Sequence, residues 1–284
     1  MIAIASLPRS MDTPRRRPSA RTLTATIALL FSAACSQGSS RSLDTVAPVA
    51  SAAAQAASAC DLPKAPNGSR VLVFSRTKGF RHASIPDGIA AVQALGVAHG
   101  FAVEATEDAT AFTDQSLSRF AAVVFMSTTG DVLDSAQQEA FQRYIRAGHG
   151  YVGVHSATDT EYDWPWYGRL VGAYFKRHPA VQEAKLDVRD RTHLATKCLP
   201  PTWTRRDEWY DFRAAPAADV TVLITIDETS YSGGTMGAVH PMSWAHAFDG
   251  GRAFYTELGH TPESYKDQLY LDHLAGGILW AMGR

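Results

Sequence analysis

The hydrophobic positions between residues 70 and 154 form short apolar runs separated by segments with a helical period. A strand that is buried on both faces of a parallel sheet is a continuous apolar run, whereas a covering helix is apolar every three to four positions. The alternation therefore predicts a doubly wound, mostly parallel α/β sheet with right-handed crossovers. The predicted strands cover residues 70–75, 101–105, 121–126 and 151–154, and the predicted helices cover residues 86–98, 114–119, 134–147 and 265–282.

The second half of the chain is less regular and predicts an antiparallel extension of the same sheet. Residues 181–188 and 220–227 are β-rich runs. Residues 242–248 and 252–256 are separated by Asp249-Gly250-Gly251, whose two glycines favour a hairpin turn. We find no internal repeat and no sign of a second domain in the sequence.

Length and charge limit the classes of function. The chain has 284 residues, of which 45% are hydrophobic, and a formal net charge of −1. This length is enough for one large α/β domain with a proper core. A net charge near zero gives no electrostatic attraction to nucleic acid or to an anionic surface. We therefore expect a small-molecule partner and no nucleic acid.

The first 35 residues have the features of a bacterial export signal. Arg15, Arg16, Arg17 and Arg21 precede an apolar stretch at residues 22–34, which is short for a transmembrane helix. The stretch leads to Cys35 in a pattern that resembles the lipobox of bacterial lipoproteins, whose cysteine is acylated after cleavage. The alternative is an ordinary secretory signal that is cut just before this cysteine. We expect an exported protein, periplasmic or an outer-membrane lipoprotein of a bacterium, which contacts the membrane only through an N-terminal lipid anchor at Cys35.

A flexible tether is expected at residues 36–60, and the folded domain at residues 61–284. The tether is rich in Ser, Ala and Gln and has no amphipathic pattern. Cys60 begins the folded part, and Cys198 lies in a proline-bounded loop. Because disulfides persist in exported proteins, we predict that these two cysteines form one. The alternative is a pair of unrelated thiols.

The candidate site is centred on the predicted strand at residues 151–154. In an open α/β sheet, ligands bind outside the carboxyl ends of the strands, which is where His155 and Asp159 lie. The layout also resembles a nucleophile elbow, which holds a serine or cysteine on a tight turn between strand and helix. Here a histidine takes the place of the nucleophile and Ser156 comes one residue late, so acyl chemistry of the elbow type is not expected.

From about residue 70 to the end, the chain resembles ThuA-like domains, the trehalose-utilisation family. The resemblance rests on short segments that occur in the family's order over most of the chain. These segments are Gly79–His82, Gly153–Asp159, Leu170–Pro179, Asp207–Phe212, His240–Trp244 and Gly251–His260.

The resemblance implies a flavodoxin-like sheet of the kind found in class I glutamine amidotransferases. The family lacks the amidotransferase cysteine, in agreement with a histidine at position 155. It is associated with disaccharides such as trehalose and sucrose and with their 3-keto derivatives. We therefore expect a carbohydrate as the small-molecule partner.

Several histidines and carboxylates lie where predicted strands end. Because parallel strands deliver their carboxyl ends to one edge, His82 and His155 are expected to share a cavity that His260 can also reach. Carboxylates can orient an imidazole or transfer protons themselves. The catalytic candidates are His82, His155, Asp159, Glu208 and His260.

Aromatic residues near these positions could present flat apolar faces to a sugar ring. The candidates for substrate binding are Arg81, Trp164, Trp209, Tyr210 and His240. A structural interpretation is open for several of them. The tryptophans can belong to the core, Glu208 can be a salt-bridge partner, and His178 and His240, each before a proline, can serve turns.

Two mechanisms fit such a pocket. In one, histidine and glutamate transfer protons on a sugar during hydrolysis, elimination or isomerisation beside a keto group. In the other, imidazoles and a carboxylate bind a divalent metal such as zinc, which polarises a hydroxyl or a carbonyl. No tight HxH or HExxH spacing supports a metal, so the cofactor stays open. The candidate metal ligands are His82, His155, His240 and His260.

The favoured hypothesis is an exported enzyme that acts on disaccharides or their 3-keto derivatives, as a hydrolase, lyase or isomerase. The alternative is a non-catalytic sugar-binding lipoprotein that scavenges for a transporter. A binding protein would gain thermal stability from the sugar and leave it unconverted.

Overall fold

The computed structural model describes residues 60–283, in which strands and helices alternate along the first half of the domain. In chain order the elements are β1 (Arg70–Phe74), α1 (Ile85–His99), β2 (Ala102–Thr106), α2 (Asp114–Leu117), β3 (Ala122–Met126), α3 (Ser135–Arg146), β4 (Gly150–Val154), α4 (Pro165–Val171), β5 (Phe175–Arg177), β6 (Gln182–Val188), β7 (Thr202–Asp207), β8 (Asp211–Phe212), β9 (Thr221–Ile226), β10 (Pro241–Phe248), β11 (Gly251–Thr256) and α5 (Gln268–Ala281).

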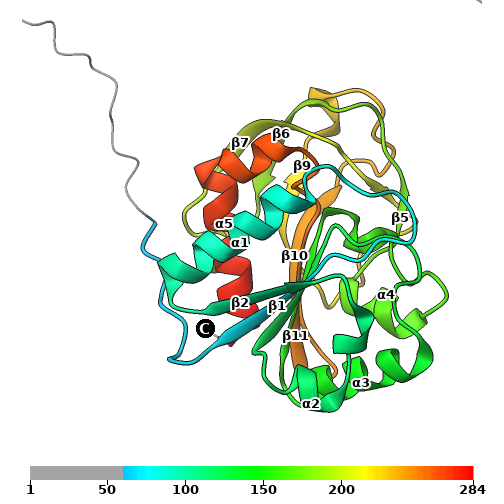
Figure 1. The fold of residues 1–284 in the computed structure, drawn as a ribbon. Coiled ribbons are helices and arrows are strands. Elements are labelled where there is room, and N and C mark those ends of the chain that lie inside the picture. The colour runs from blue at the N-terminus through cyan, green and yellow to red at the C-terminus, as the bar shows by residue number, and fades with distance from the viewer. Residues whose placement is uncertain (1–59, 284) are drawn as a thin grey trace, which may run out of the picture. The chain divides into compact units, whose positions relative to one another are not determined.

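Nine strands form the central sheet, in the order β2-β1-β3-β4-β11-β10-β9-β6-β7. The pairings from β2 to β11 are parallel, and those from β11 to β7 are antiparallel. The predicted fold class, a mostly parallel α/β sheet with an antiparallel extension, is therefore confirmed. Helices α1 and α5 cover one face of the sheet, and α2, α3 and α4 lie on the other (Figure 1).

Local sequence signals account for the central elements. The strand β3 is buried at every position, as its uninterrupted apolar sequence predicts. Helix α3 begins with a capping box, in which the Asp134 side chain accepts from the Gln137 backbone N–H and the Gln137 side chain accepts in return. Helix α1 ends at Gly100, whose φ of 81° is a left-handed conformation that favours glycine.

Helix α4 and strands β5, β7 and β8 were not predicted. The sequence of β7 explains one omission, because its inward-facing positions are Trp203, Arg205 and Asp207, all of them buried. Charged residues at two of three core positions remove the apolar alternation by which a half-buried strand is recognised. The closing helix also differs from the prediction, because a 3₁₀ helix at Pro262–Lys266 precedes α5.

The direction of β7 matters for function. Four antiparallel pairings separate β7 from β11, so β7 runs in the same direction as the parallel strands. The segment that follows β7 therefore leaves the sheet at the same edge as the segments that follow β1, β4 and β11. This edge carries the candidate site.

The predicted disulfide between Cys60 and Cys198 is present, with Cα atoms 5.7 Å apart. The bridge links the start of the described region to the loop before β7, 138 residues further along the chain. The predictions for Cys35, the export signal and most of the tether concern residues 1–59, which lie outside the described residues. Between residues 60 and 283, no helix combines the length and the apolar character that crossing a membrane requires.

Replacing Cys60 and Cys198 together by serine is expected to lower the free energy of unfolding by about 3–5 kcal/mol. The physical reason is that a cross-link over a long loop restricts the unfolded chain. Urea unfolding of both proteins, monitored by circular dichroism, measures the difference. Equal midpoints in the oxidised wild type and the double variant would contradict a stabilising role.

Candidate active site

His155 directly follows β4, at a sharp turn where it begins the 3₁₀ helix His155–Asp159. Its φ of 50° falls in the left-handed region, which is uncommon for residues with a side chain. The hydroxyl of Tyr255 donates to the carbonyl oxygen of His155 at 2.7 Å and holds the turn. A Cβ atom at Gly153 would lie 2.7 Å from the Tyr151 hydroxyl oxygen, so only glycine fits under this turn. The chain thus presents a histidine where a nucleophile elbow presents a serine or a cysteine.

The other candidate ligands reach the same place from separate segments. His82 lies in the loop between β1 and α1, His260 follows β11, and Glu208 directly follows β7. The hydroxyl of Ser84 donates to the carbonyl oxygen of Gly259 at 3.2 Å, which ties the loop of His82 to that of His260. The sheet edge therefore brings together residues that are far apart in the sequence, as predicted from its topology.

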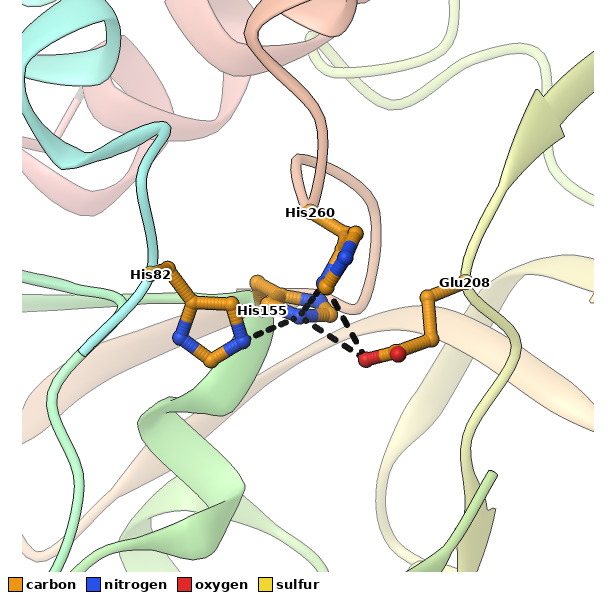
Figure 2. A group of neighbouring side chains, drawn as sticks. All are labelled: His82, His155, Glu208 and His260. Atoms are coloured by element: carbon orange, nitrogen blue, oxygen red, sulfur yellow. Dashed lines mark hydrogen bonds and ion pairs between the residues drawn. The ribbon is translucent and has the colours of Figure 1, made fainter. Parts of the chain in front are cut away.

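Three imidazoles and one carboxylate point toward a common centre (Figure 2). The Nε2 atom of His155 lies 3.2 Å from Nε2 of His82 and 3.1 Å from Nδ1 of His260. The Oε2 atom of Glu208 lies 3.5 Å from Nε2 of His155 and 3.1 Å from Nδ1 of His260. The side chain of His260 is partly exposed, whereas the other three residues are buried. The four side chains together have the compactness of a metal-binding group, since their ligand atoms lie within 4.8 Å of one another.

The lone pair of His155 Nε2 is directed at this centre. The Nδ1–H group of His155 donates to the carbonyl oxygen of Glu257 at 2.8 Å, which assigns the proton to Nδ1 in the neutral ring. A hydroxyl oxygen, that of Tyr210, also lies 3.1 Å from Nε2. One lone pair accepts one hydrogen bond, yet four polar atoms surround it. A cation at the centre could be bound by the facing nitrogen and oxygen atoms at once.

The charge of each side chain in this cluster depends on its neighbours. Burial and the neighbouring imidazoles lower the pKa of His82 to about 3, so its ring is neutral near pH 7. Burial opposes ionisation of Glu208, but its contacts with the imidazoles of His155 and His260 outweigh burial and hold the pKa of the carboxyl well below its usual range. Burial lowers the pKa of His260, but the bond to Glu208 outweighs it and raises that pKa above its ordinary value. A metal ion would therefore compete with a proton on His260.

Two further side chains hold Glu208 and its neighbours in position. The Nδ1 atom of His178 lies 2.9 Å from Oε1 of Glu208, the oxygen that faces away from His155. The carboxylate of Asp207, which is fully buried, accepts from the backbone N–H groups of Gly259 at 3.1 Å and His260 at 3.2 Å. These contacts fasten the loop of His260 to the end of β7. Partners of this kind orient metal ligands in proteins.

A cavity of about 300 Å³ opens onto the cluster. Burial raises the pKa of Asp159, which lines this cavity, although the Tyr162 hydroxyl donates to its carboxylate at 2.6 Å. Burial and Glu208 raise the pKa of Tyr210 well above its ordinary value, so its hydroxyl stays protonated. Both groups can therefore exchange or donate protons at the cavity wall. The lining residues are Phe80, His82, Asp159, Phe175, His178, Glu208, Tyr210 and His260.

Four of the five residues expected to bind substrate, all except Tyr210, do not line this cavity. Trp164 is buried and stacks on Trp166, with ring centroids 5.1 Å apart. Trp209 is fully buried, and its Nε1–H group donates to the backbone oxygen of Gln182. The expectation that these tryptophans meet a sugar is therefore wrong, and both belong to the core. Arg81 is exposed and pairs with Glu107 at 2.6 Å.

His240 belongs to a different cluster, so its assignment as a ligand beside the other three histidines is wrong. Its Nδ1 atom lies 2.8 Å from Oε1 of Glu228, and its Nε2–H group donates to the backbone oxygen of Tyr210 at 2.8 Å. The carboxylate of Asp211 completes this cluster and pairs with Arg177 at 2.7 Å. Each side chain already has protein partners, so the cluster supports the segment that carries Tyr210.

Sequence reasoning missed three residues that support the site. His178 contacts Glu208 and therefore does more than serve the turn before Pro179. Asp207 and Glu257 are both fully buried. The Asp207 carboxylate holds the loop of His260, and the backbone oxygen of Glu257 accepts a hydrogen bond from His155. All three lie inside the segments that carry the resemblance to the ThuA-like domains. That placement was the available signal, since none of them follows a recognisable motif.

A mixed α/β sheet with a buried histidine and carboxylate cluster at its carboxyl edge defines the class of this protein. The family model for trehalose utilisation, ThuA, matches residues 70–281, and the chain belongs to this family. The resemblance stated from the sequence is therefore confirmed. A comparison of the sequence with curated proteins found no match.

Solved structures support the fold. A ThuA-like protein from Bacteroides uniformis has a TM-score of 0.66 at 22% identity, covering 78% of this chain and 94% of its own. A second ThuA-like protein, from Parabacteroides merdae, has a TM-score of 0.62 at 21% identity, covering 76% and 91%. A cytoplasmic protein from Salmonella typhimurium has a TM-score of 0.52 at 10% identity, and the match covers 74% of this chain and 98% of the Salmonella protein. At these identities the comparison establishes the fold alone.

Proposed function

We propose that this protein is a metal-dependent enzyme that acts on disaccharides or their keto derivatives. The observation that carries the proposal is the convergence of His82, His155, His260 and Glu208 at the floor of a cavity. Membership of the trehalose-utilisation family supports the class of substrate. The chemistry of the cluster supports the catalytic part.

The geometry of the cluster fits a small divalent cation. Around zinc, with bonds of about 2.0–2.1 Å, the ligands of a tetrahedron lie about 3.4 Å apart. The separations of His155 Nε2 from the three other ligand atoms, and of Glu208 Oε2 from His260 Nδ1, are 3.1–3.5 Å. Three imidazole nitrogens and one carboxylate oxygen suit zinc and other first-row transition metals. His82, His260 and Glu208 also line the cavity, so a substrate there would lie beside the centre and could bind an ion as a fifth ligand, which zinc can accept.

Residues around the cavity supply the rest of the chemistry. A bound divalent ion would supply Lewis-acid polarisation of a sugar carbonyl or hydroxyl oxygen. Asp159, with its raised pKa, would take or return a proton on a sugar carbon or hydroxyl group. The protonated hydroxyl of Tyr210 would donate a hydrogen bond to an oxygen of the substrate. The contact from the exposed His178 ring keeps Glu208 oriented while this occurs.

Turnover of a keto-disaccharide in the presence and absence of metal tests the proposal. The full chain is treated with a chelator, dialysed, and assayed with trehalose and 3-keto-trehalose by NMR before and after addition of Zn²⁺ or Mn²⁺. We expect conversion of the keto sugar to be lost with the metal and restored by one of the ions. Undiminished conversion by the metal-free protein would refute the metal-dependent mechanism, and acid–base catalysis by the protein side chains would then be the explanation. A sugar that raises the melting temperature and is never converted would make the protein a sugar-binding protein.

We further propose that the protein works outside the reducing cytoplasm. The disulfide between Cys60 and Cys198 supports this location, because such bridges persist in oxidising compartments. Mass spectrometry of the protein purified from its native membrane fraction distinguishes a lipidated Cys35 from a cleaved, unmodified chain.

A further inference from the structure

We infer that the site binds a disaccharide across two adjoining cavities, with Phe80 as the platform between the two sugar rings; this rests on the proposed function. A second cavity, of about 230 Å³, shares Phe80, His82 and His260 with the first. The volume of each cavity is near the lower end of the range for small-molecule sites, about 300–1,000 Å³. A ligand made of two linked rings fits this pair of cavities better than a single ring does.

Phe80 has the exposure and the support that a stacking platform needs. It is 68% exposed, and it is the one aromatic among the large exposed hydrophobic residues of the described region, which otherwise are Val97 and Val239. The flat apolar face of Phe80 can cover the C–H face of a sugar ring, and this contact would remove apolar surface of both partners from water.

The backbone under this ring is fixed. The Thr129 hydroxyl donates to the carbonyl oxygen of Phe80 at 2.8 Å and accepts from the Gly79 N–H group at 3.2 Å. The Phe80 ring stands edge to face against His82, with centroids 4.9 Å apart. The ring is therefore held beside a candidate metal ligand while much of its surface stays open to solvent.

The two cavities differ in chemistry, which assigns a role to each. The first contains Asp159, Glu208 and Tyr210, the groups that bind metal or move protons, so it takes the reacting ring. The second is lined by Val181 and Pro262 together with polar Thr261 and Glu263, and it takes the other ring. The glycosidic oxygen would then pass beside Phe80, His82 and His260, which both cavities share.

Obstruction of the second cavity tests this assignment. Ala83 lines that cavity and is exposed, so Ala83→Trp adds an indole there without disturbing the core. Val97→Trp, on the exposed face of α1 and 87% exposed, is the matched control. Phe80→Ala removes the platform. Calorimetric titration of the full chain with trehalose and with methyl α-glucoside measures binding independently of turnover.

We expect Ala83→Trp and Phe80→Ala to weaken trehalose binding about tenfold or more, with Val97→Trp unchanged. Ala83→Trp should leave the affinity for methyl α-glucoside within about twofold, because one ring needs only the first cavity. Equal weakening of both sugars by Ala83→Trp, or no weakening of trehalose, would overturn the inference. Absence of trehalose binding to the wild type would overturn it as well. Selective loss of trehalose binding in a protein that converts no sugar would support the two cavities and refute the enzymatic function.

Discussion

Replacing His155 by asparagine is expected to abolish metal binding and turnover while the domain stays folded. The variant lacks Nε2, the atom that lies within 3.2 Å of nitrogen atoms of both His82 and His260. Loss of an outer partner of a metal ligand already costs about 10–100-fold in affinity, so loss of a ligand should cost at least ~100-fold. Metal content per chain and the rate of sugar conversion measure the two effects.

The choice of asparagine protects the fold of the turn. Asparagine tolerates the left-handed φ of 50° at this position better than alanine does, and its amide can donate to the Glu257 carbonyl oxygen. His246→Asn is the matched control, because His246 is also buried and also bonds a backbone carbonyl oxygen, that of Leu170. Normal metal content and activity in His155→Asn would refute the site. A similar loss in both variants would indicate a general loss of structure.

Replacing Glu208 by glutamine is expected to lower metal affinity about 10–100-fold, because a neutral amide oxygen is a weaker ligand than a carboxylate. The same variant should lower the pKa of His260 in the metal-free protein, since the bond to Glu208 is what raises that pKa above its ordinary value. The sign follows from burial, which disfavours the charged ring and is opposed only by Asp207 once the Glu208 carboxylate is gone. Competition titration with a zinc indicator and NMR titration of the His260 ring measure the two effects.

Glu183→Gln, on the exposed side of β6, serves as the control for removing one negative charge. It should change neither quantity. An unchanged midpoint of His260 in Glu208→Gln would show that the two side chains do not interact in solution. Unchanged zinc affinity would remove Glu208 from the ligand set and leave three histidines.

The first half of the fold was predictable because its strands are uninterrupted apolar runs and its helices have clear ends. Residues 122–126 are all buried, and Gly100 ends α1 as its sequence indicates. Strand β7 was not predictable, because buried Arg205 and Asp207 pair with each other at 2.9 Å in place of apolar contacts. A charge pair inside the fold looks, in sequence, like an exposed strand or loop.

The candidate site was predictable as far as the sheet topology reaches. Strand ends brought His82, His155 and His260 together, and Glu208 joined them because β7 runs parallel to β11. The role of the aromatic residues was not predictable. Trp209 and Tyr210 are adjacent, yet one is buried in the core and the other faces the cavity, a difference that depends on the direction of a segment of irregular structure.

Anomalous scattering from crystals of the metal-loaded protein, recorded on both sides of the zinc absorption edge, tests the central claim most directly. The expected result is one strong peak between His82, His155, His260 and Glu208, at about 2.0–2.2 Å from their nitrogen and oxygen atoms. The peak should disappear in crystals of His155→Asn grown under the same conditions. A well-ordered cluster with no peak, at zinc concentrations that support turnover, would contradict the metal site and leave the histidines and Glu208 to act by proton transfer.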